Sequence, residues 1–245
     1  MKFAIVIPAR MASSRLPGKV MLDICGLPML ERVRQQALKA KHVSEVYIAT
    51  CDDVIEEFFS HQKKTTVIRT SDAHKSGTSR CAEAIKKISN KYTHLVLVQG
   101  DEPLINPDHI DQFIESIKID NDCFAWNAVS DCEGDDVTDI SVVKAVISRP
   151  QKIMYCFRVP PFLAIKKDHA GVVKKMQGLM AFTSEYLLEL CNSDAGIIEL
   201  SESIEQMRIL ERGESLTAIN LPISKPSVNT EADLIKVISI LKNPN

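Results

Sequence analysis

Residues 3–19 read FAIVIPARMASSRLPGK and join a short apolar run, residues 3–7, to a loop that carries Arg10, Arg15 and Lys19. The run is rich in β-branched residues and ends at a proline, which is typical of a buried strand. A solvated surface turn is the simplest alternative for the loop, because arginine and lysine are common at protein surfaces. The remainder of the chain decides between these interpretations.

The first run is followed by an alternation of apolar runs and helical patterns. Further strand-like runs occupy residues 46–50, 65–69 and 95–99, and helical patterns occupy residues 28–41, 52–61, 78–90 and 107–118. This alternation predicts an α/β fold of βαβ units around a mostly parallel central sheet that is buried on both faces. A buried helix fragment is the alternative for each run alone, but the flanking prolines and glycines favour strands.

The pattern is looser after residue 120. Strands are predicted at residues 123–130, 141–148 and 177–182, helices at 184–192, 203–212 and 230–242, and an acidic loop at 131–141. The sequence contains no internal repeat or low-complexity tract. We therefore expect a single domain, residues 1–245, with a smaller lobe inserted or appended.

Composition excludes several classes of protein. Thirty basic and thirty-two acidic residues give a formal net charge of −2, so neither nucleic acid nor an anionic membrane is expected as a partner. The seven cysteines include no C-x-x-C pair, which argues against a zinc site or a disulfide framework. The sequence has neither a signal-peptide core nor a run approaching the roughly 20 apolar residues that span a bilayer. A cytoplasmic protein with reduced thiols is the expectation.

The loop after the first strand has the chemistry of an anion-binding cradle. Its three positive charges are Arg10, Arg15 and Lys19, and its small residues include Ala9, Ser13 and Ser14. Small residues let backbone N–H groups approach an anion, and each hydrogen bond to a charged group contributes about 1.5–3 kcal/mol. A triphosphate, with a charge of roughly −4, would match such a cradle.

Two other nucleotide-binding motifs are excluded. A P-loop requires glycine at position 13 and serine or threonine at position 20, where this chain has Ser13 and Val20. No strand is followed by G-x-G-x-x-G in the sequence, which argues against a dinucleotide cofactor.

Two later loops follow strands of the same predicted sheet. VQGDEPLI places Asp101 just past a buried strand, where its carboxylate could hold Mg²⁺, a cation that takes one or two carboxylates plus phosphate oxygens. HKSGTSR offers Ser76 and Gly77 at a helix start for hydrogen bonds to a base or ribose. A turn aspartate and an ordinary helix cap are the structural alternatives. Because the carboxyl ends of parallel strands share one edge of a sheet, all three loops are expected to meet there.

The motifs IPARMASSRLPGK, SGTSR and VQGDEP stand in the order and spacing of a known family. The chain resembles the CMP-sugar-acid synthetases, in particular the 3-deoxy-manno-octulosonate (Kdo) cytidylyltransferases. The resemblance is strong over roughly the first 110 residues and continues more weakly through SVVKAV, YCFR, ESIEQMRILERG and VNTEADL. It therefore covers nearly the whole chain.

This resemblance implies a Rossmann-like nucleotidyltransferase fold with a smaller dimerisation and sugar-binding lobe. The nucleotide-binding part would span about residues 1–120, the sugar-binding and dimerisation part about 121–228, and a C-terminal helix 229–245. It also implies a homodimer that uses CTP and Mg²⁺, transferring CMP to the anomeric hydroxyl of a sugar acid for lipopolysaccharide or capsule synthesis.

The family's functional residues carry over position by position. The resemblance implies catalytic roles for Arg15, Lys19 and Asp101, and nucleotide binding by Ala9, Arg10, Ser13, Ser14, Arg15, Lys19, Ser76, Gly77 and Gln99. It implies a metal site at Asp101 and Asn229, and sugar binding by Arg158, Met176, Met180, Glu205 and Gln206.

Some of these positions depart from the family pattern. Asn229 replaces an aspartate, so it keeps an oxygen ligand but loses the charge. Met176 and Met180 stand where the family has histidine and tyrosine, and core packing is an equally good account of both, because methionine fills irregular gaps. A solvated helix face is the alternative for Glu205 and Gln206. The acceptor could therefore be another acid, such as a nonulosonate, and a non-catalytic nucleotide-binding protein is the third alternative.

Overall fold

Four strands from the first half of the chain form a parallel group in the computed structural model, which describes residues 1–13, 15–88, 91–120, 122–160 and 172–243. They are β1 (Phe3–Pro8), β4 (Val46–Thr50), β5 (Thr65–Arg69) and β6 (His94–Val98), paired in the order β6-β1-β4-β5. All four correspond to runs that the sequence analysis assigned to strands.

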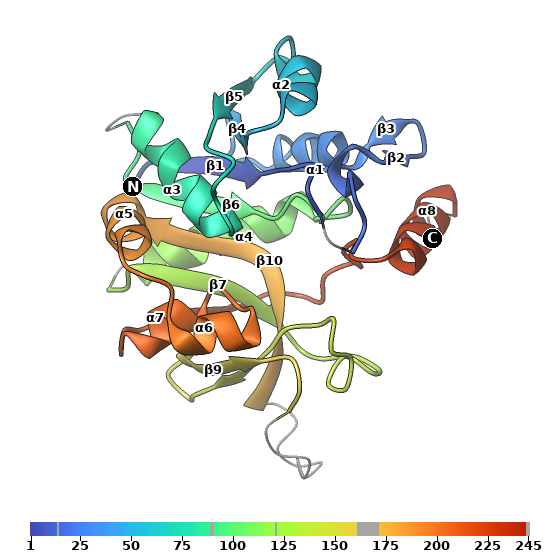
Figure 1. The fold of residues 1–245 in the computed structure, drawn as a ribbon. Helices are drawn as coiled ribbons and strands as arrows, with labels where there is room; N and C mark the ends of the chain where they lie inside the picture. The colour runs from blue at the N-terminus through green and yellow to red at the C-terminus, as the bar shows by residue number, and fades with distance from the viewer. Residues whose placement is uncertain (14, 89–90, 121, 161–171, 244–245) are drawn as a thin grey trace.

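The sheet is extended on the other side of β6 by strands from the second half of the chain (Figure 1). The long strand β10 (Val173–Thr183) is antiparallel to β6 and to β7 (Ala125–Ser130), and β11 (Thr217–Asn220) is parallel to β7. Strands β6, β7 and β11 therefore run in one direction with β10 reversed among them. The prediction of an α/β fold with a mostly parallel sheet is confirmed.

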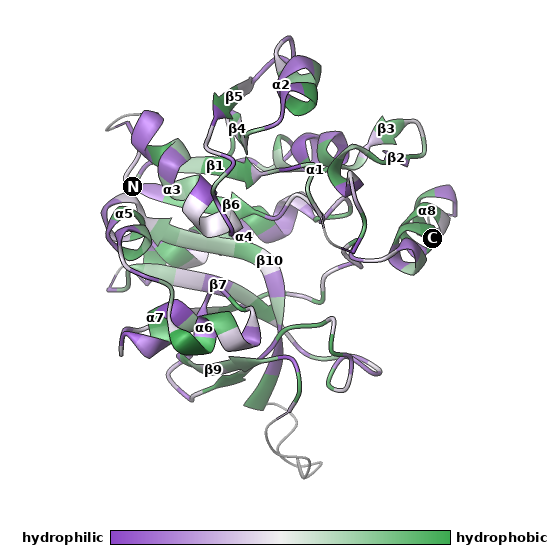
Figure 2. Cartoon of the chain, viewed as in Figure 1, coloured by the Kyte–Doolittle hydropathy of each residue, from purple (hydrophilic) through white to green (hydrophobic). Residues whose placement is uncertain are grey.

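Alternate residues of the central strands enter two separate apolar cores. Ile5 and Ile7 of β1 pack on one face, which is covered by helices α1 (Met29–Ala37), α2 (Asp53–Phe59), α4 (Pro107–Ile119) and α8 (Glu231–Lys242). Ala4 and Val6 pack on the opposite face under α3 (Gly77–Lys87) and α5 (Ser184–Asn192). Figure 2 shows the same strands as apolar segments between helices with polar outer faces. Burial on both faces explains why their sequences are continuous apolar runs.

A smaller lobe lies alongside β7, below it in the view of Figure 1. It contains β8 (Lys144–Ile147), which pairs with both β10 and β9 (Ile153–Phe157), and two short helices, α6 (Ile197–Glu202) and α7 (Met207–Glu211). The expected strand at 141–148 is shorter than predicted. The expected helix at 203–212 begins only at Met207, because Ser203 adopts the left-handed backbone conformation with φ of 54°.

The order of the strands reverses at β1. The chain moves from β1 to β4 and β5 on one side, and then returns to β6 on the other side of β1. In open sheets of this kind, ligands bind beyond the carboxyl ends of the strands at such a reversal. The helices that the structure describes include none with the length and apolar character needed to cross a bilayer.

Candidate active site

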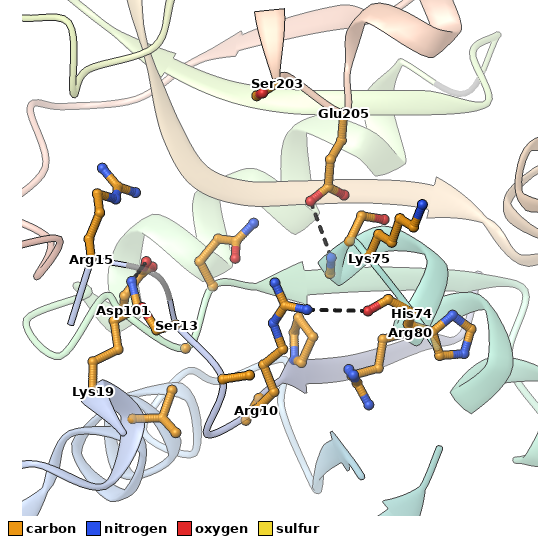
Figure 3. A pocket seen from close by; sticks show the side chains of 18 residues that line it. Arg10, Ser13, Arg15, Lys19, His74, Lys75, Arg80, Asp101, Ser203 and Glu205 are labelled. Atoms are coloured by element: carbon orange, nitrogen blue, oxygen red, sulfur yellow. Dashed lines mark hydrogen bonds and ion pairs between the residues drawn. The ribbon is translucent and has the colours of Figure 1, made fainter. Parts of the chain in front are cut away.

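A pocket of about 380 Å³ lies at the carboxyl ends of β1 and β6 (Figure 3). The predicted site residues that line it are Ala9, Arg10, Ser13, Arg15, Lys19, Ser76, Gly77, Gln99, Asp101 and Glu205. The three loops that follow β1, β5 and β6 therefore meet at one edge of the sheet, as expected. Ser14 lies outside the described residues.

The first loop is folded back on itself at Gly18. The N–H of Gly18 donates to the carbonyl of Met11 over 2.9 Å, and Gly18 has φ of 68°, a conformation that glycine adopts without strain. The N–H of Met11 donates to Asp52 Oδ2 over 2.8 Å. These contacts fix both ends of the loop, so that Arg10 and Lys19 lie on opposite sides of the pocket floor (Figure 3).

The pocket has an excess of positive charge. Five cationic side chains line it, Arg10, Arg15, Lys19, Lys75 and Arg80, against two carboxylates, Asp101 and Glu205. Arg10 donates a long hydrogen bond of 3.4 Å to the carbonyl of His74. Because this bond is long, the guanidinium of Arg10 stays available to an anion. The arrangement suits a ligand with several negative charges.

Arg80 is the most buried of these cations, with 2% of its surface exposed. One terminal nitrogen, Nη1, donates to Thr70 Oγ1 over 2.6 Å and to the carbonyl of Ser71 over 3.2 Å. The other, Nη2, has no hydrogen-bond acceptor among the residues described. A buried guanidinium held on one side in this way is a rigid donor beside the pocket.

Asp101 is paired with Lys19 and lies next to the segment that contains Asn229. Lys19 Nζ is 2.7 Å from Asp101 Oδ2 and also donates to the carbonyl of Val228 over 3.2 Å. The N–H of Val228 donates to the carbonyl of Asp101 over 2.9 Å, which places residue 229 at the same side of the pocket. Arg15 Nη2 donates to Asn229 Oδ1 over 3.0 Å.

The chemistry of this pair of oxygen donors fits Mg²⁺. One carboxylate and one amide oxygen, completed by phosphate oxygens of a substrate, is a donor set that Mg²⁺ accepts. The described residues contain no group of three histidine, cysteine or acidic side chains arranged for metal binding.

Glu102 packs beneath this site against a bulge in β10. The bulge lies between Met176 and Met180, and within it Gly178 accepts a hydrogen bond from the N–H of Gln99 over 2.9 Å. A Cβ atom on Gly178 would lie 2.6 Å from Glu102 Oε1, so a side chain there would displace the carboxyl group. Burial, together with the negative charge of Asp101, raises the pKa of Glu102 to about 8.

The start of helix α3 is held by a glutamate from the smaller lobe. Glu205 accepts hydrogen bonds from the N–H groups of Gly77, over 3.2 Å, and Thr78, over 2.9 Å, and reaches them from the opposite side of the pocket (Figure 3). The positive end of a helix dipole favours such a carboxylate. Ser76 caps the helix by accepting from the N–H of Ser79 over 3.1 Å, and it also lines the pocket, so nucleotide binding by Ser76 stays a prediction.

The remaining predicted sugar-binding residues do not line the pocket. Gln206 donates to Asn127 Oδ1 over 3.0 Å and to Met180 Sδ over 3.4 Å. Met180 is 2% exposed and lies within the core, and the partly buried Met176 packs against the same core. This placement matches the core-packing alternative, and a contact with sugar by either methionine stays a prediction.

Arg158 is close enough to Arg15 for the two charges to interact. Its Nη1 donates to the carbonyls of Ile140, over 3.3 Å, and Ser141, over 3.1 Å. Burial and the positive charge of Arg15 lower the pKa of Arg158. Arg158 is thus anchored in the smaller lobe and does not line the pocket.

Sequence reasoning left several lining residues without a role. They are His74, Lys75, Arg80 and Ser203. The first three belong to HKSGTSR, and the motif itself was the available signal, since its cations flank the predicted helix start. Ser203 follows a short helix that the sequence did not predict, and no pattern pointed to it.

Comparison with known proteins gives matches over nearly the full length. The sequence model of the cytidylyltransferase family matches residues 4–216. The chain is 34% identical to the 3-deoxy-manno-octulosonate cytidylyltransferase of Parabacteroides distasonis, covering 99% of each, and 31% identical to that of Escherichia coli, covering 98% and 96%. A solved CMP:2-keto-3-deoxy-manno-octonic acid synthetase in complex with CTP superposes with a TM-score of 0.88 at 30% identity, covering 99% of both chains.

Proposed function

The chain belongs to the cytidylyltransferase family, as its sequence resemblance predicted, and we propose that it transfers CMP from CTP to the anomeric hydroxyl of Kdo or a closely related sugar acid. The other product is pyrophosphate, and the CMP-sugar would serve lipopolysaccharide or capsule synthesis. The observation that carries this proposal is the convergence of the cationic loop, Asp101 and Glu205 on one pocket.

Positioning and electrostatics would supply most of the catalysis. The sugar hydroxyl attacks the α-phosphorus of CTP, and negative charge accumulates on the pyrophosphate as it leaves. Arg15 and Lys19 would neutralise that charge, and Arg10 would orient the phosphate chain from the other side of the pocket. Because the loop contacts fix the backbone, only the side chains of these donors need to turn toward the phosphates.

Asp101 and Asn229 would hold Mg²⁺ together with the nucleotide's phosphates. The chemistry that the cation supplies when bound is neutralisation of charge on the phosphate oxygens. Lys19 and Arg15, which contact these two oxygen donors, would then turn toward the triphosphate. Because Asn229 is neutral, affinity for the cation would depend strongly on the charge of Asp101.

The acceptor half of the site departs from the family pattern at Met176 and Met180, so the proposal includes sugar acids related to Kdo. Glu205 is the sugar-contact candidate that lines the pocket, whereas Arg158 lies outside it in the smaller lobe. The proposal also includes a homodimer in the cytoplasm. Its cytoplasmic part is supported by seven cysteines that are all free thiols.

A panel of acceptors tests this function. Purified protein with Mg²⁺ and CTP would be assayed for pyrophosphate release with Kdo, a deoxy analogue of Kdo, a nonulosonate and no acceptor. We expect kcat/KM to be highest for Kdo or its analogue. A higher value for the nonulosonate would reassign the acceptor, and CTP binding without turnover on any acid would support a non-catalytic protein.

A further inference from the structure

Three polar side chains converge far from the pocket, at the opposite edge of the sheet. Cys123 precedes β7, Lys152 precedes β9, and Thr217 is the first residue of β11. Because β7 and β11 run in the same direction as β6, their first residues lie at the end of the sheet away from the carboxyl ends that form the active site. Cys123 is 7% exposed, and none of the three residues has a role in the proposed reaction.

The nitrogen and sulfur atoms of Lys152 and Cys123 are unusually close. Lys152 Nζ lies 2.7 Å from Cys123 Sγ. Other nitrogen–sulfur contacts in this protein are longer: 3.3 Å from the N–H nitrogen of Cys156 to Met207 Sδ, and 3.4 Å from Gln206 Nε2 to Met180 Sδ. Hydrogen bonds from nitrogen to oxygen span about 2.7–3.2 Å, and those to the larger sulfur atom must be longer. The separation is therefore too short for a hydrogen bond, and it suits two atoms bonded to one bridging atom.

We propose that Lys152 and Cys123 form a covalent oxygen bridge, Nζ–O–Sγ, when the protein is oxidised. The amine and the thiol each lose two electrons, and dioxygen, the oxidant, accepts all four. One N–H and the S–H bond break, while N–O and O–S bonds form. One oxygen atom stays in the bridge, and the other leaves as water with the two hydrogens. If the lysine begins as an ammonium group, it first releases one proton to solvent.

Thr217 completes the geometry of this modification site. Its hydroxyl oxygen is 2.8 Å from Lys152 Nζ and 2.9 Å from Cys123 Sγ, so it lies beside both atoms that the bridge would join. From this position the hydroxyl can donate a hydrogen bond to the bridging oxygen. Cys123 is buried and its sulfur would already be bonded to the bridging oxygen, which disfavours further oxidation to higher sulfur oxides.

The bridge would connect the smaller lobe to the central sheet. Cys123 and Lys152 are 29 positions apart, and an isolated bridge already pairs Lys152 with Thr217. A covalent link across a loop of this length restricts the unfolded chain, as a disulfide does. Oxidation would therefore raise the melting temperature, and reduction of the bridge by a thiol would lower it again.

Mass spectrometry of the full chain tests the proposal. Protein kept in air-saturated buffer would be compared with protein kept anaerobically with a thiol reductant. We expect the air-exposed protein to gain one oxygen and lose two hydrogens, and trypsin to leave a cross-linked peptide uncut at Lys152. Reductant should restore the original mass. Cys123→Ser and Lys152→Arg should each abolish the bridged mass, whereas Cys51→Ser and Lys174→Arg should retain it.

Other products of air exposure would overturn the proposal. They are an unchanged mass, oxygen atoms added to Cys123 while trypsin still cuts at Lys152, and a loss of two hydrogens without oxygen, which marks a direct N–S bond or a disulfide. Melting temperatures give a second reading: the bridged protein should melt roughly 5–10 °C above the reduced form. Equal melting temperatures for bridged and reduced protein would contradict the stabilising role.

Discussion

Lys19 Nζ lies 2.7 Å from Asp101 Oδ2, although 82 positions separate the two residues in the sequence. Lys19 comes from the loop after β1 and Asp101 from the loop after β6, so the reversal of strand order brings them together. In this arrangement the lysine neutralises the carboxylate. When nucleotide and cation bind, the pair would separate. Lys19 would then contact a phosphate, and Asp101 would bind the metal.

Removing single cations from the first loop should slow the reaction strongly. Arg15→Ala and Lys19→Ala should each cost about 2–4 kcal/mol of transition-state stabilisation, the scale for losing one preorganised donor. Steady-state pyrophosphate release would give kcat/KM for each variant. Arg69→Ala is the matched control, because Arg69 is exposed and pairs with Asp53 and Glu56. Activity near that of wild type in both loop variants would remove this loop from the triphosphate site.

Asp101→Asn should nearly abolish turnover. The substitution keeps the shape of the side chain but removes the charge that would hold Mg²⁺, and Asn229 offers only a neutral oxygen. Turnover would be measured over a range of Mg²⁺ concentrations. Full activity of Asp101→Asn at saturating Mg²⁺ would show that Asp101 is not an essential ligand.

Asn229→Asp should lower the Mg²⁺ concentration needed for half-maximal activity. A second carboxylate would attract the cation more strongly, and Arg15, which now contacts Asn229 Oδ1, would partly offset the gain. The comparison with wild type needs only a Mg²⁺ titration at fixed CTP. An unchanged requirement would mean that residue 229 lies outside the metal's ligands.

Glu205→Gln should weaken substrate binding in the pocket. Glu205 holds the N–H groups of Gly77 and Thr78, and losing a charged hydrogen-bond acceptor costs about 1.5–3 kcal/mol, or about 10- to 150-fold in kcat/KM. The KM for the sugar acid and the KM for CTP would be measured separately. Glu202→Gln serves as the control, because Glu202 contacts Tyr155 instead. Equal effects of the two substitutions would contradict a role for Glu205 in the site.

Glu102→Gln should change the pH dependence of stability. The pKa of Glu102 is raised from 4.5 to about 8, so its contribution is fully present below pH 4.5 and is lost as pH rises through 8. Within that window the loss approaches about 1.4 kcal/mol per pH unit, and glutamine does not titrate. The melting temperature of the variant minus that of wild type, measured without nucleotide, should therefore be larger at pH 8 than at pH 5.

Glu83→Gln gives a comparison of opposite sign. Burial opposes ionisation of Glu83, but hydrogen bonds from Lys87, from the N–H of Ser71 and from His74 outweigh it and lower the pKa to about 2. Its contribution is present above pH 4.5 and is lost as pH falls toward 2, so this variant should be less stable than wild type at neutral pH. The same direction of change in both variants would contradict these assignments.

The sequence predicted the parts of the fold that have strong local signals. Strands β1, β4 and β6 are buried on both faces, so their apolar runs identified them. Strand β5, at the edge of the sheet, is less buried and was identified by its β-branched residues. Strands β9 and β11 and helix α6 were missed, because they are only four to six residues long and their burial depends on neighbours from distant parts of the chain.

Some residues of the candidate site could likewise be predicted from the sequence, and others could not. The loop residues at strand ends could be placed from topology, since parallel strands bring their carboxyl ends to one edge. The locations of Met180 in the core and of Gln206 against Asn127 depend on the bulge in β10. No local sequence pattern predicted this bulge. Arg80 was visible in its motif, but only the packing around it shows a buried guanidinium beside the pocket.

Conversion of CTP to a CMP-sugar tests the central claim most directly. Wild-type protein and Asp101→Asn would be incubated with CTP, Mg²⁺ and Kdo, and phosphorus NMR would follow the nucleotide. The account predicts that wild type converts the triphosphate signals into those of a CMP phosphodiester and free pyrophosphate in equal amounts, while the variant leaves CTP largely unchanged. Pyrophosphate release without the phosphodiester, or equal conversion by both proteins, would contradict it.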